Sequence, residues 1–332
     1  MSSTLYGDIS PRTAAYAEKE LLKRGLPFLV LEKFGQAKTL PDHSTKVMKF
    51  RRYNALPTNP VALSEGVTPG SRALSVTDVT ATLTQYGDVV EISDVILDTH
   101  EDPTLNEAVA VIGEQAAQMI EKMRFGVIKA GTNVIYGNGA SRSAVVTPMT
   151  GSTGLQLQRR AVRALKRQNA RFITSVIRST PSYGTENVAP GFVAMIHPDL
   201  EADVRGLPGF VPAEKYGSMT PWENELGKVE DVRYVSSTVF EAWANAGGAA
   251  GGTLLSTGGT SADVYPILLV ARDAYAIIAL KGAFAVTPSV VNPKPSDSDP
   301  LAQRGKVGWK AMQTAVILND AFQIRIEVAA SA

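Results

Sequence analysis

Asp299-Pro-Leu-Ala-Gln-Arg-Gly-Lys-Val-Gly-Trp-Lys310 is the stretch of this 332-residue sequence that says most about its fold. The stretch combines a proline turn, two glycines, one tryptophan and three basic side chains, and it contains no group suited to catalysis. Such a mixture is typical of packing and of contact surfaces. Two alternating apolar runs, residues 307–317 and 322–328, continue from it and predict an antiparallel strand pair that turns at Asn319-Asp320.

The composition indicates a folded, nearly neutral protein. Hydrophobic residues make up 44% of the chain, and its length corresponds to roughly two domains of about 150 residues. With 33 basic and 32 acidic residues the formal net charge is +1, so no overall field draws the protein to nucleic acid or to a membrane. The absence of cysteine excludes disulfides, thiolate metal sites and a cysteine nucleophile, and it fits a reducing cytoplasm. No apolar segment approaches the ~18 residues that span a bilayer, so we expect a soluble protein without a membrane partner.

The amino-terminal region predicts a short helix followed by a connecting segment. Residues 1–8 lack the basic and apolar parts of a secretory signal. Residues 11–24 form an amphipathic pattern that ends at Gly25 and Pro27. The apolar segment 28–41 fits either an arm on a partner's surface or a short buried strand, and both alternatives stay open.

Residues 44–94 predict a long hairpin. Strand-forming residues fill Val47–Tyr53, and apolar residues alternate with threonine around residues 79–84. A polar stretch rich in proline and glycine, residues 56–70, lies between them. A connection of this length is usually an interaction loop or a mobile segment. One small core can hardly cover such a hairpin, so we expect its tip to order against a neighbouring subunit.

The clearest element is a single long helix from about residue 102 to 131. It begins at Asp102-Pro103 with a Thr104-x-x-Glu107 capping box, and at about 1.5 Å per residue it extends ~40 Å. An apolar stripe repeats at helical spacing through Leu105, Ala108, Ile112, Ala116, Met119, Met123 and Val127. We expect this stripe to pack on a sheet. The predicted solvated face consists of Glu114, Gln118, Glu121 and Lys122.

A second helix, beginning near Leu155, carries the one marked charge cluster of the sequence. Its basic residues are Arg159, Arg160, Arg163, Lys166, Arg167 and Arg171, and no acidic residue lies among them. Such a face could contact the phosphate backbone of DNA without reading its sequence. The alternative is a solvated face, or one that forms ion pairs with acids of a neighbouring subunit. The lack of an aromatic stacking pattern favours the alternative.

The remaining chain predicts short strands joined by loops. An apolar strand at residues 191–196 ends at His197, which we expect to cap a short helix that Gly206 stops. Residues 206–298 are rich in loops, with buried strands at residues 265–270 and 275–280. A proline-rich linker at residues 288–299 then leads back to the first domain.

Enzyme signatures are absent from the sequence. The three histidines lie in different elements without paired ligand spacing, and there is neither a phosphate-binding loop nor a nucleophile elbow. An acidic cluster could supply paired carboxylates, although a polar loop often produces one by chance; it comprises Glu223, Glu225, Glu230 and Asp231. We therefore predict no catalytic residue, no metal and no organic cofactor.

The order of these elements resembles the Hong Kong 97-type capsid subunit of tailed bacteriophages, and four motifs resemble its coliphage N-four-type subgroup. They are Phe50-Arg-Arg-Tyr53, Leu63-Ser-Glu-Gly-Val-Thr-Pro69, Ile196-His-Pro-Asp199 and Leu301-Ala-Gln-Arg-Gly-Lys-Val-Gly-Trp-Lys310. The resemblance implies an α+β Hong Kong 97-like capsid fold in four parts. These are an N-terminal arm (1–43), an extended loop (44–94), a peripheral domain with the spine helix (95–150 and 296–332) and an inserted axial domain (151–295).

The resemblance also implies a function. It predicts a major capsid protein that self-assembles as hexamers and pentamers into the icosahedral shell enclosing viral double-stranded DNA. Implied partners are further copies of the chain, the portal, scaffolding or decoration proteins, and DNA in non-specific contact. Assembly in the bacterial host cytoplasm and a final location in the virion are expected.

In this fold the extended loop reaches over a neighbour, so Arg51, Arg52 and Glu65 become candidates for salt bridges across the subunit boundary. Nothing in the sequence identifies the residues of a Lys-Asn crosslink, so we predict none. Two alternatives stay open. One is an encapsulin-type cellular nanocompartment shell of the same fold, and the other is a two-domain α+β enzyme.

Overall fold

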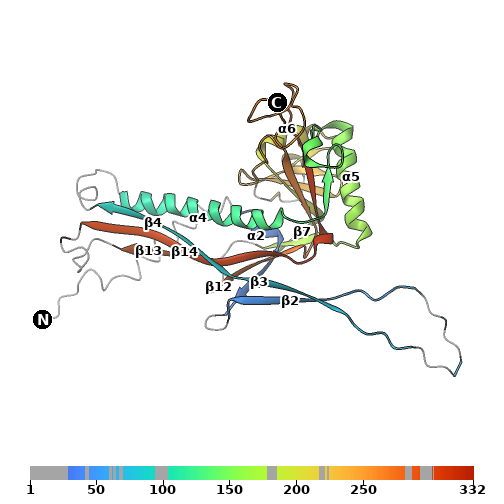
Figure 1. Ribbon diagram of the computed structural model, residues 1–332, viewed down its shortest axis with the longest axis horizontal. Helices are drawn as coiled ribbons and strands as arrows, with labels where there is room; N and C mark the ends of the chain where they lie inside the picture. Colours follow the sequence, from blue (N-terminus) through green and yellow to red (C-terminus); the bar gives the residue numbers. More distant parts are fainter. Residues whose placement is uncertain are drawn as a thin grey trace.

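The predicted long helix forms in the computed structural model of the protein as α4 (Thr104–Ile128), and it lies along the longest strand, β14 (Arg304–Ile317). Together they form an elongated unit beside a more rounded unit, as Figure 1 shows. The structure describes residues 29–41, 45–59, 62, 65–66, 70–93, 104–177, 185–216, 221–222, 224–280, 286–291, 301 and 303–332. The predicted helix at 11–24, the capping residues Asp102-Pro103 and the linker residues 292–300 lie outside these ranges.

The elongated unit is built on a five-stranded sheet, here called the peripheral sheet. Its strands are β1 (Gln36–Leu40), β12 (Tyr275–Leu280), β14, β13 (Val286–Val291) and β4 (Thr84–Ser93). Because β14 has 14 residues, it pairs with β4 along one edge and with β13 and β12 in succession along the other. Every second residue of a strand points to the same face. Val307, Trp309 and Ala311 therefore all meet the apolar stripe of α4, where Ile112 is buried.

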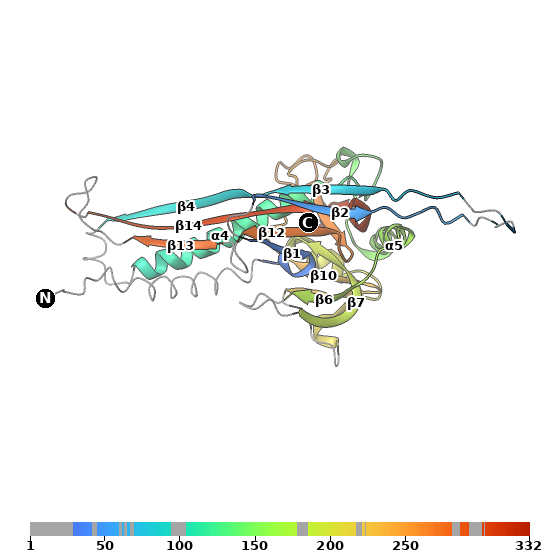
Figure 2. The same ribbon diagram turned by 90° about the horizontal axis from the view of Figure 1, so that it is seen from below.

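The predicted hairpin forms from β2 (Val47–Tyr53) and β3 (Val76–Thr82), paired antiparallel from Val47 opposite Thr82 to Tyr53 opposite Val76. Its base packs on the peripheral sheet, where Met48 and Phe50 contact a cluster that includes Ala81 and Ile278. Beyond this base the hairpin projects away from both units (Figures 1 and 2). The chain then continues from β3 into β4, which pairs with β14 and not with the hairpin.

The rounded unit contains an eight-stranded sheet, here called the axial sheet, in the order β5-β15-β11-β7-β10-β9-β8 with β6 paired to β7. Helix α5 (Gly151–Arg167) packs on one face through Leu157, Ala161 and Leu165. Phe125 and Ile128, near the end of α4, pack on the opposite face. The strands of this sheet are β5 (Val134–Tyr136), β6 (Ile173–Ile177), β7 (Thr185–Ile196), β8 (Val211–Pro212), β9 (Glu225–Val229), β10 (Val232–Ser236), β11 (Tyr265–Val270) and β15 (Gln323–Val328).

Several predicted local features are present. His197 Nδ1 accepts a hydrogen bond from the Asp199 amide at the start of a 3-10 turn, and α6 (Glu201–Arg205) ends at Gly206. The remaining short elements are the helix α2 (Leu31–Phe34) and the 3-10 turns η3 (Arg142–Ala144), η4 (Pro198–Leu200), η5 (Ala213–Lys215) and η6 (Asp320–Phe322). In the segment 29–41, α2 is followed by β1, which pairs in parallel with β12. This segment therefore packs within its own chain, with Val30, Leu31, Phe34 and Leu40 buried, in agreement with the strand alternative.

The predicted antiparallel pair of residues 307–317 and 322–328 is wrong. The first run forms β14 in the peripheral sheet, whereas the second forms β15, which pairs with β11 and β5 in the axial sheet. The turn η6 redirects the chain between the two sheets, with Asn319 accepting from the amide of Ala321. An alternating pattern fits any half-buried strand and does not specify its partner.

The two sheets also divide the chain at places other than those predicted. Strands β12 and β13 lie with β14, although residues 151–295 were expected to form one inserted domain. Conversely, β5 and β15 lie in the axial sheet. Among the residues that the structure describes, no helix is both long enough and apolar enough to cross a membrane.

Candidate interaction surfaces

Arg51 and Arg52 lie on opposite faces of the hairpin because successive residues of a strand alternate. Arg51 faces Asp78 across the two strands. Its Nε donates to Asp78 Oδ1 at 2.9 Å and its Nη2 donates to Oδ2 at 3.0 Å. These bonds raise the pKa of the Arg51 guanidinium and lower the pKa of the Asp78 carboxyl. The charge of Arg51 is thus already matched within its own subunit.

Arg52 lies on the other face, opposite Thr77 and two residues along the strand from Phe50. It is exposed, and no ion pair joins it to any described residue. Glu65 is also exposed and lies in the turn at the hairpin tip, beside Gly66, whose positive φ of 76° suits glycine. Most of the motif 63–69 lies outside the described residues.

The distal part of the hairpin exposes large apolar side chains. Tyr53 and Val76 form the last cross-strand pair and are 64% and 45% exposed, respectively. Leu56 and Leu74 lie further out and are 48% and 67% exposed. An accumulation of exposed apolar side chains on one projection marks a surface that another molecule covers.

The basic face of α5 divides into paired and unpaired residues. Arg159 forms an ion pair with Glu230, and Lys166 Nζ lies 2.5 Å from Asp231 Oδ2. Both acids come from the turn between β9 and β10, where Glu230 adopts a positive φ of 51°. The bonds to Arg159 lower the pKa of Glu230. The ion pairs expected from the sequence were with acids of a neighbouring subunit, whereas these two acids belong to the same chain.

Arg160, Arg163 and Arg167 are exposed on the same helix, and no ion pair within the described ranges involves them. At spacings of three and four residues they form one stripe along α5. Next to the stripe lies an open hollow of about 520 Å³, whose lining includes Arg163 and Arg167 together with Glu230 and Asp231. The surface therefore presents both signs of charge side by side.

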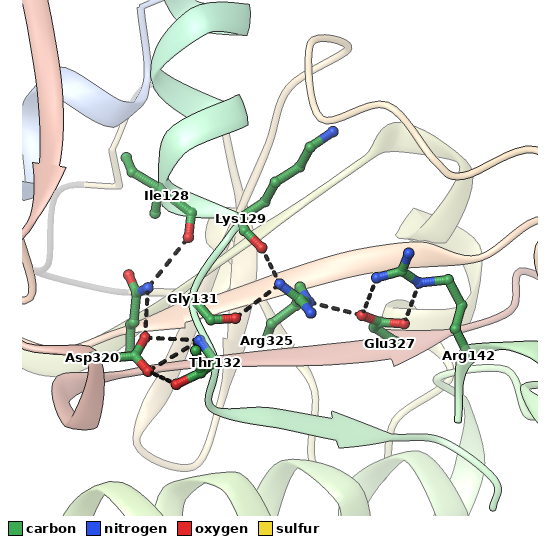
Figure 3. A network of polar contacts seen from close by, with 9 residues as sticks. Ile128, Lys129, Gly131, Thr132, Arg142, Asp320, Arg325 and Glu327 are labelled. Carbon is green, nitrogen blue, oxygen red and sulfur yellow. Dashed lines mark hydrogen bonds and ion pairs between the residues drawn. The ribbon is translucent and has the colours of Figure 1, made fainter. Parts of the chain in front are cut away.

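The C-terminal end of α4 is joined to the axial sheet by a polar network, shown in Figure 3. Arg325 donates through Nη1 to the carbonyl oxygens of Lys129 and Gly131, the latter at 3.0 Å. Its Nε donates to Glu327 Oε1 at 2.8 Å, and Arg142 binds both oxygens of the same carboxylate at 2.7 and 2.8 Å. Glu327 is completely buried.

The same junction contains a second group of contacts. Asp320 accepts from the amide and hydroxyl of Thr132, while Gln323 donates to the Ile128 carbonyl at 3.3 Å. Carbonyl groups at a helix end lack partners within the helix. Gln323 and Arg325 of β15 donate to them here, so this junction, here called the α4–β15 junction, sets the direction of the spine helix relative to the axial sheet.

Glu121 is a further interior polar residue, and the prediction that it is solvated is wrong. Its Oε1 accepts from the amides of Val30 and Leu31 at 2.9 and 2.7 Å, and its side chain is completely buried. Burial raises the pKa of Glu121 to about 7. The sequence does carry a signal, because Ala117, Phe125 and Ile128 occur at helical spacing from Glu121 and are all buried.

The acidic cluster that could have served catalysis is engaged in structural contacts. Glu225 binds Arg233 through both oxygens and also accepts from the Tyr216 hydroxyl. Glu230 and Asp231 form the ion pairs with α5, and Glu223 lies outside the described residues. Within the described ranges no group of histidines and acids is arranged to hold a metal ion.

The stretch at residues 299–310 is divided between packing and surface. Trp309 and Val307 are buried against α4, whereas Lys306 and Lys310 are exposed on the opposite face of the sheet. Gly308 lies under the neighbouring strand, where an added Cβ would be 2.8 Å from the Asp88 carbonyl oxygen. The glycine thus permits close pairing of β14 with β4.

Residues 76–319 match a family model described as phage capsid protein. No curated protein matches the sequence. Among solved structures, the capsid of cyanophage Pam1 aligns with a TM-score of 0.64 at 14% identity, covering 93% of this chain and 92% of that one. The capsid of Ralstonia phage GP4 gives 0.64 at 15% identity with coverage of 90% and 87%, and that of cyanophage P-SCSP1u gives 0.59 at 16% with 91% and 88%. The fold is thus the Hong Kong 97-like fold expected from the sequence.

Proposed function

This chain belongs to the phage capsid protein family, and from that membership we propose that its copies close into an icosahedral shell through the projecting hairpin. It is a major capsid protein, located in the capsid of the virion, and its role is structural. The family membership does not favour the encapsulin-type alternative. The observation that carries the proposal is that the hairpin leaves its own subunit while exposing Tyr53, Leu56, Leu74 and Val76.

The hairpin acts as a clamp on a neighbouring subunit. Its base is held by the peripheral sheet through Met48 and Phe50, so the distal part is carried at a defined position. Individual exposed contacts are worth about 0–1 kcal/mol, but each is repeated at every equivalent boundary of a closed symmetric shell. Arg52 and Glu65 form salt bridges across that boundary. Arg51 contributes less, because Asp78 already binds it.

The basic face of α5 contacts a neighbouring subunit. Two observations support this over contact with DNA. The carboxylates of Glu230 and Asp231 form ion pairs on the face and also line the adjacent hollow, and the chain as a whole is nearly neutral. Fixed carboxylates repel a phosphate backbone, whereas a protein surface of mixed charge complements them. Arg160, Arg163 and Arg167 supply the unmatched positive charge. Their partners are acidic side chains of another copy.

The remaining features follow from the resemblance. The peripheral sheet with α4 and the axial sheet with α5 act as the peripheral and axial domains. Of the expected arm, 1–43, residues 1–28 act as the arm, whereas β1 belongs to the peripheral sheet. The motifs Phe50-Arg-Arg-Tyr53 and Ile196-His-Pro-Asp199 support the coliphage N-four-type subgroup. The partners are further copies of the chain in hexamers and pentamers, the portal, scaffolding or decoration proteins, and packaged double-stranded DNA. Assembly takes place in the host cytoplasm. The chain has no catalytic activity.

Sedimentation and negative-stain electron microscopy of the expressed chain test the proposal. We expect closed, uniform particles or rings of subunits that close on addition of a scaffolding protein. Monomers under all of these conditions would contradict it. A catalytic activity that is lost on changing one acidic residue would favour the two-domain enzyme instead.

A further inference from the structure

The buried carboxyl of Glu121 holds together two parts of the chain that are far apart in sequence. Its Oε1 accepts the main-chain N–H groups of Val30 and Leu31 at 2.9 and 2.7 Å. Val30 and Leu31 are themselves completely buried. The Tyr275 hydroxyl of β12 donates to the Leu31 carbonyl at 2.6 Å, so the segment is held from the peripheral sheet as well.

The charges around this carboxyl do not balance. Arg124 is the cation that faces it, but Arg124 Nη1 lies 3.1 Å from Glu32 Oε2 and 3.9 Å from Glu121 Oε2. Its Nη2 donates to the neutral Gln313 of β14 at 2.8 Å. Two carboxyls thus share one guanidinium, and the cluster has an excess negative charge when both are ionised.

The second oxygen of Glu121 lacks a hydrogen-bond partner, and the Arg124 guanidinium 3.9 Å away compensates its charge only in part. Among the described residues no hydrogen-bond partner reaches Glu121 Oε2, although it is buried. An ionised oxygen without a partner in the interior is costly, and a proton on the carboxyl removes that cost. Among the residues that the structure describes, the other titratable groups that act on this carboxyl are Glu32, Arg124 and Tyr275. The pKa of Tyr275 is raised well above its usual value by burial, so this phenol stays neutral.

We propose that Glu121 is a proton-dependent latch, which holds the segment 30–34 on α4 while its carboxyl is protonated and releases it when the carboxyl ionises. The segment joins residues 1–28 to the peripheral sheet, so the latch controls where the amino-terminal arm leaves the subunit. The inference does not depend on the proposed intersubunit contacts, because every group in it belongs to one chain.

The direction of the pH effect follows from the two states. With the segment docked, the pKa of Glu121 is about 7, and with the segment released we take the ordinary value of 4.5. Both states are protonated below pH 4.5, so pH has no effect there. Between 4.5 and 7 release becomes up to about tenfold more favourable per pH unit, and above 7 the effect levels off at about 300-fold in total.

Hydrogen exchange of the amides at residues 30–34, measured by mass spectrometry on the full chain, tests this latch. After correction for intrinsic exchange, the opening constant should rise from pH 5 to 7 and level off above it. Glu121→Gln should abolish the rise. Glu241→Gln is the matched control, because Glu241 pairs with Lys122 of the same helix but is exposed, and it should keep the wild-type profile. An opening constant of the wild-type chain that does not change with pH would overturn the proposal, and this result requires no variant. A rise in Glu121→Gln equal to that of the wild type would also overturn it.

Discussion

Arg51 and Asp78 face each other across the β2–β3 hairpin and form a two-point ion pair, with 2.9 Å between Nε and Oδ1 and 3.0 Å between Nη2 and Oδ2. Arg52, the next residue, points to the opposite face and has no such partner among the described residues. The two neighbouring arginines therefore have different tasks. Arg51 joins the strands of one hairpin, and Arg52 is available to another subunit.

Charge-reversing substitutions at Arg51 and Arg52 test these two roles separately. Arg52→Glu should leave the subunit folded and reduce the yield of particles, because it replaces an attraction at every boundary by a repulsion. The exchanged pair Arg51→Asp with Asp78→Arg should assemble normally, because the bond within the hairpin is kept. Sucrose-gradient sedimentation measures both yields. A normal yield of particles from Arg52→Glu would show that Arg52 does not contact the neighbouring subunit.

The packing of α4 on β14 predicts a large loss of stability for Ile112→Ala. Ile112 is 3% exposed and belongs to the cluster with Trp309 and Val307. Removing such a side chain costs about 2–5 kcal/mol. Val111→Ala, a control on the same helix at a site 58% exposed, should change little. Urea unfolding of dissociated subunits, followed by tryptophan fluorescence, compares the two. Equal losses of unfolding free energy in the two variants would mean that another face of α4 meets the sheet.

At the α4–β15 junction, Arg325→Met should destabilise the subunit. The change leaves the carbonyls of Lys129 and Gly131 without this donor, and each buried polar group without a partner costs about 1–3 kcal/mol. Arg272→Met is the control, because Arg272 is half exposed and lies 3.6 Å from Asp273. Thermal unfolding gives the comparison. A loss for Arg325→Met no greater than for the control would show that the junction is not held by Arg325.

Substitution of the arginine stripe on α5 tests whether it contacts a neighbouring subunit or DNA. Replacing Arg160, Arg163 and Arg167 together by glutamate should prevent assembly of a folded subunit. The control Arg159→Gln with Glu230→Gln removes an ion pair without changing the net charge, and it should still assemble. Particles of normal size and number from the triple variant, with reduced DNA content, would instead assign the stripe to DNA.

Much of the fold was predictable because its elements have local signals. The spacing of Ile112, Ala116 and Met119 predicts α4, and the residues of Val47–Tyr53 predict β2, since apolar periodicity reports which face is covered. The pairing of β15 was not predictable in this way. Its residues Ile324, Ile326 and Val328 alternate equally well for either sheet, and only the three-dimensional path through η6 decides between them.

The polar contacts were less predictable than the fold. Alternation places Arg51 and Arg52 on opposite faces from sequence alone, but the partner Asp78 lies 27 residues away and depends on the hairpin register. Glu121 was expected in solvent because a charged residue usually is. Its place inside depends on Val30 and Leu31, which are 91 and 90 residues away in the chain.

The assembly of a variant that lacks residues 56–70 tests the central claim most directly. The deletion removes the hairpin tip but keeps β2, β3 and the base that packs on the peripheral sheet. The variant should remain soluble, with the circular dichroism spectrum of the wild-type subunit, and electron microscopy should show no closed particles. Closed shells of wild-type size from this variant would show that the hairpin does not join the subunits.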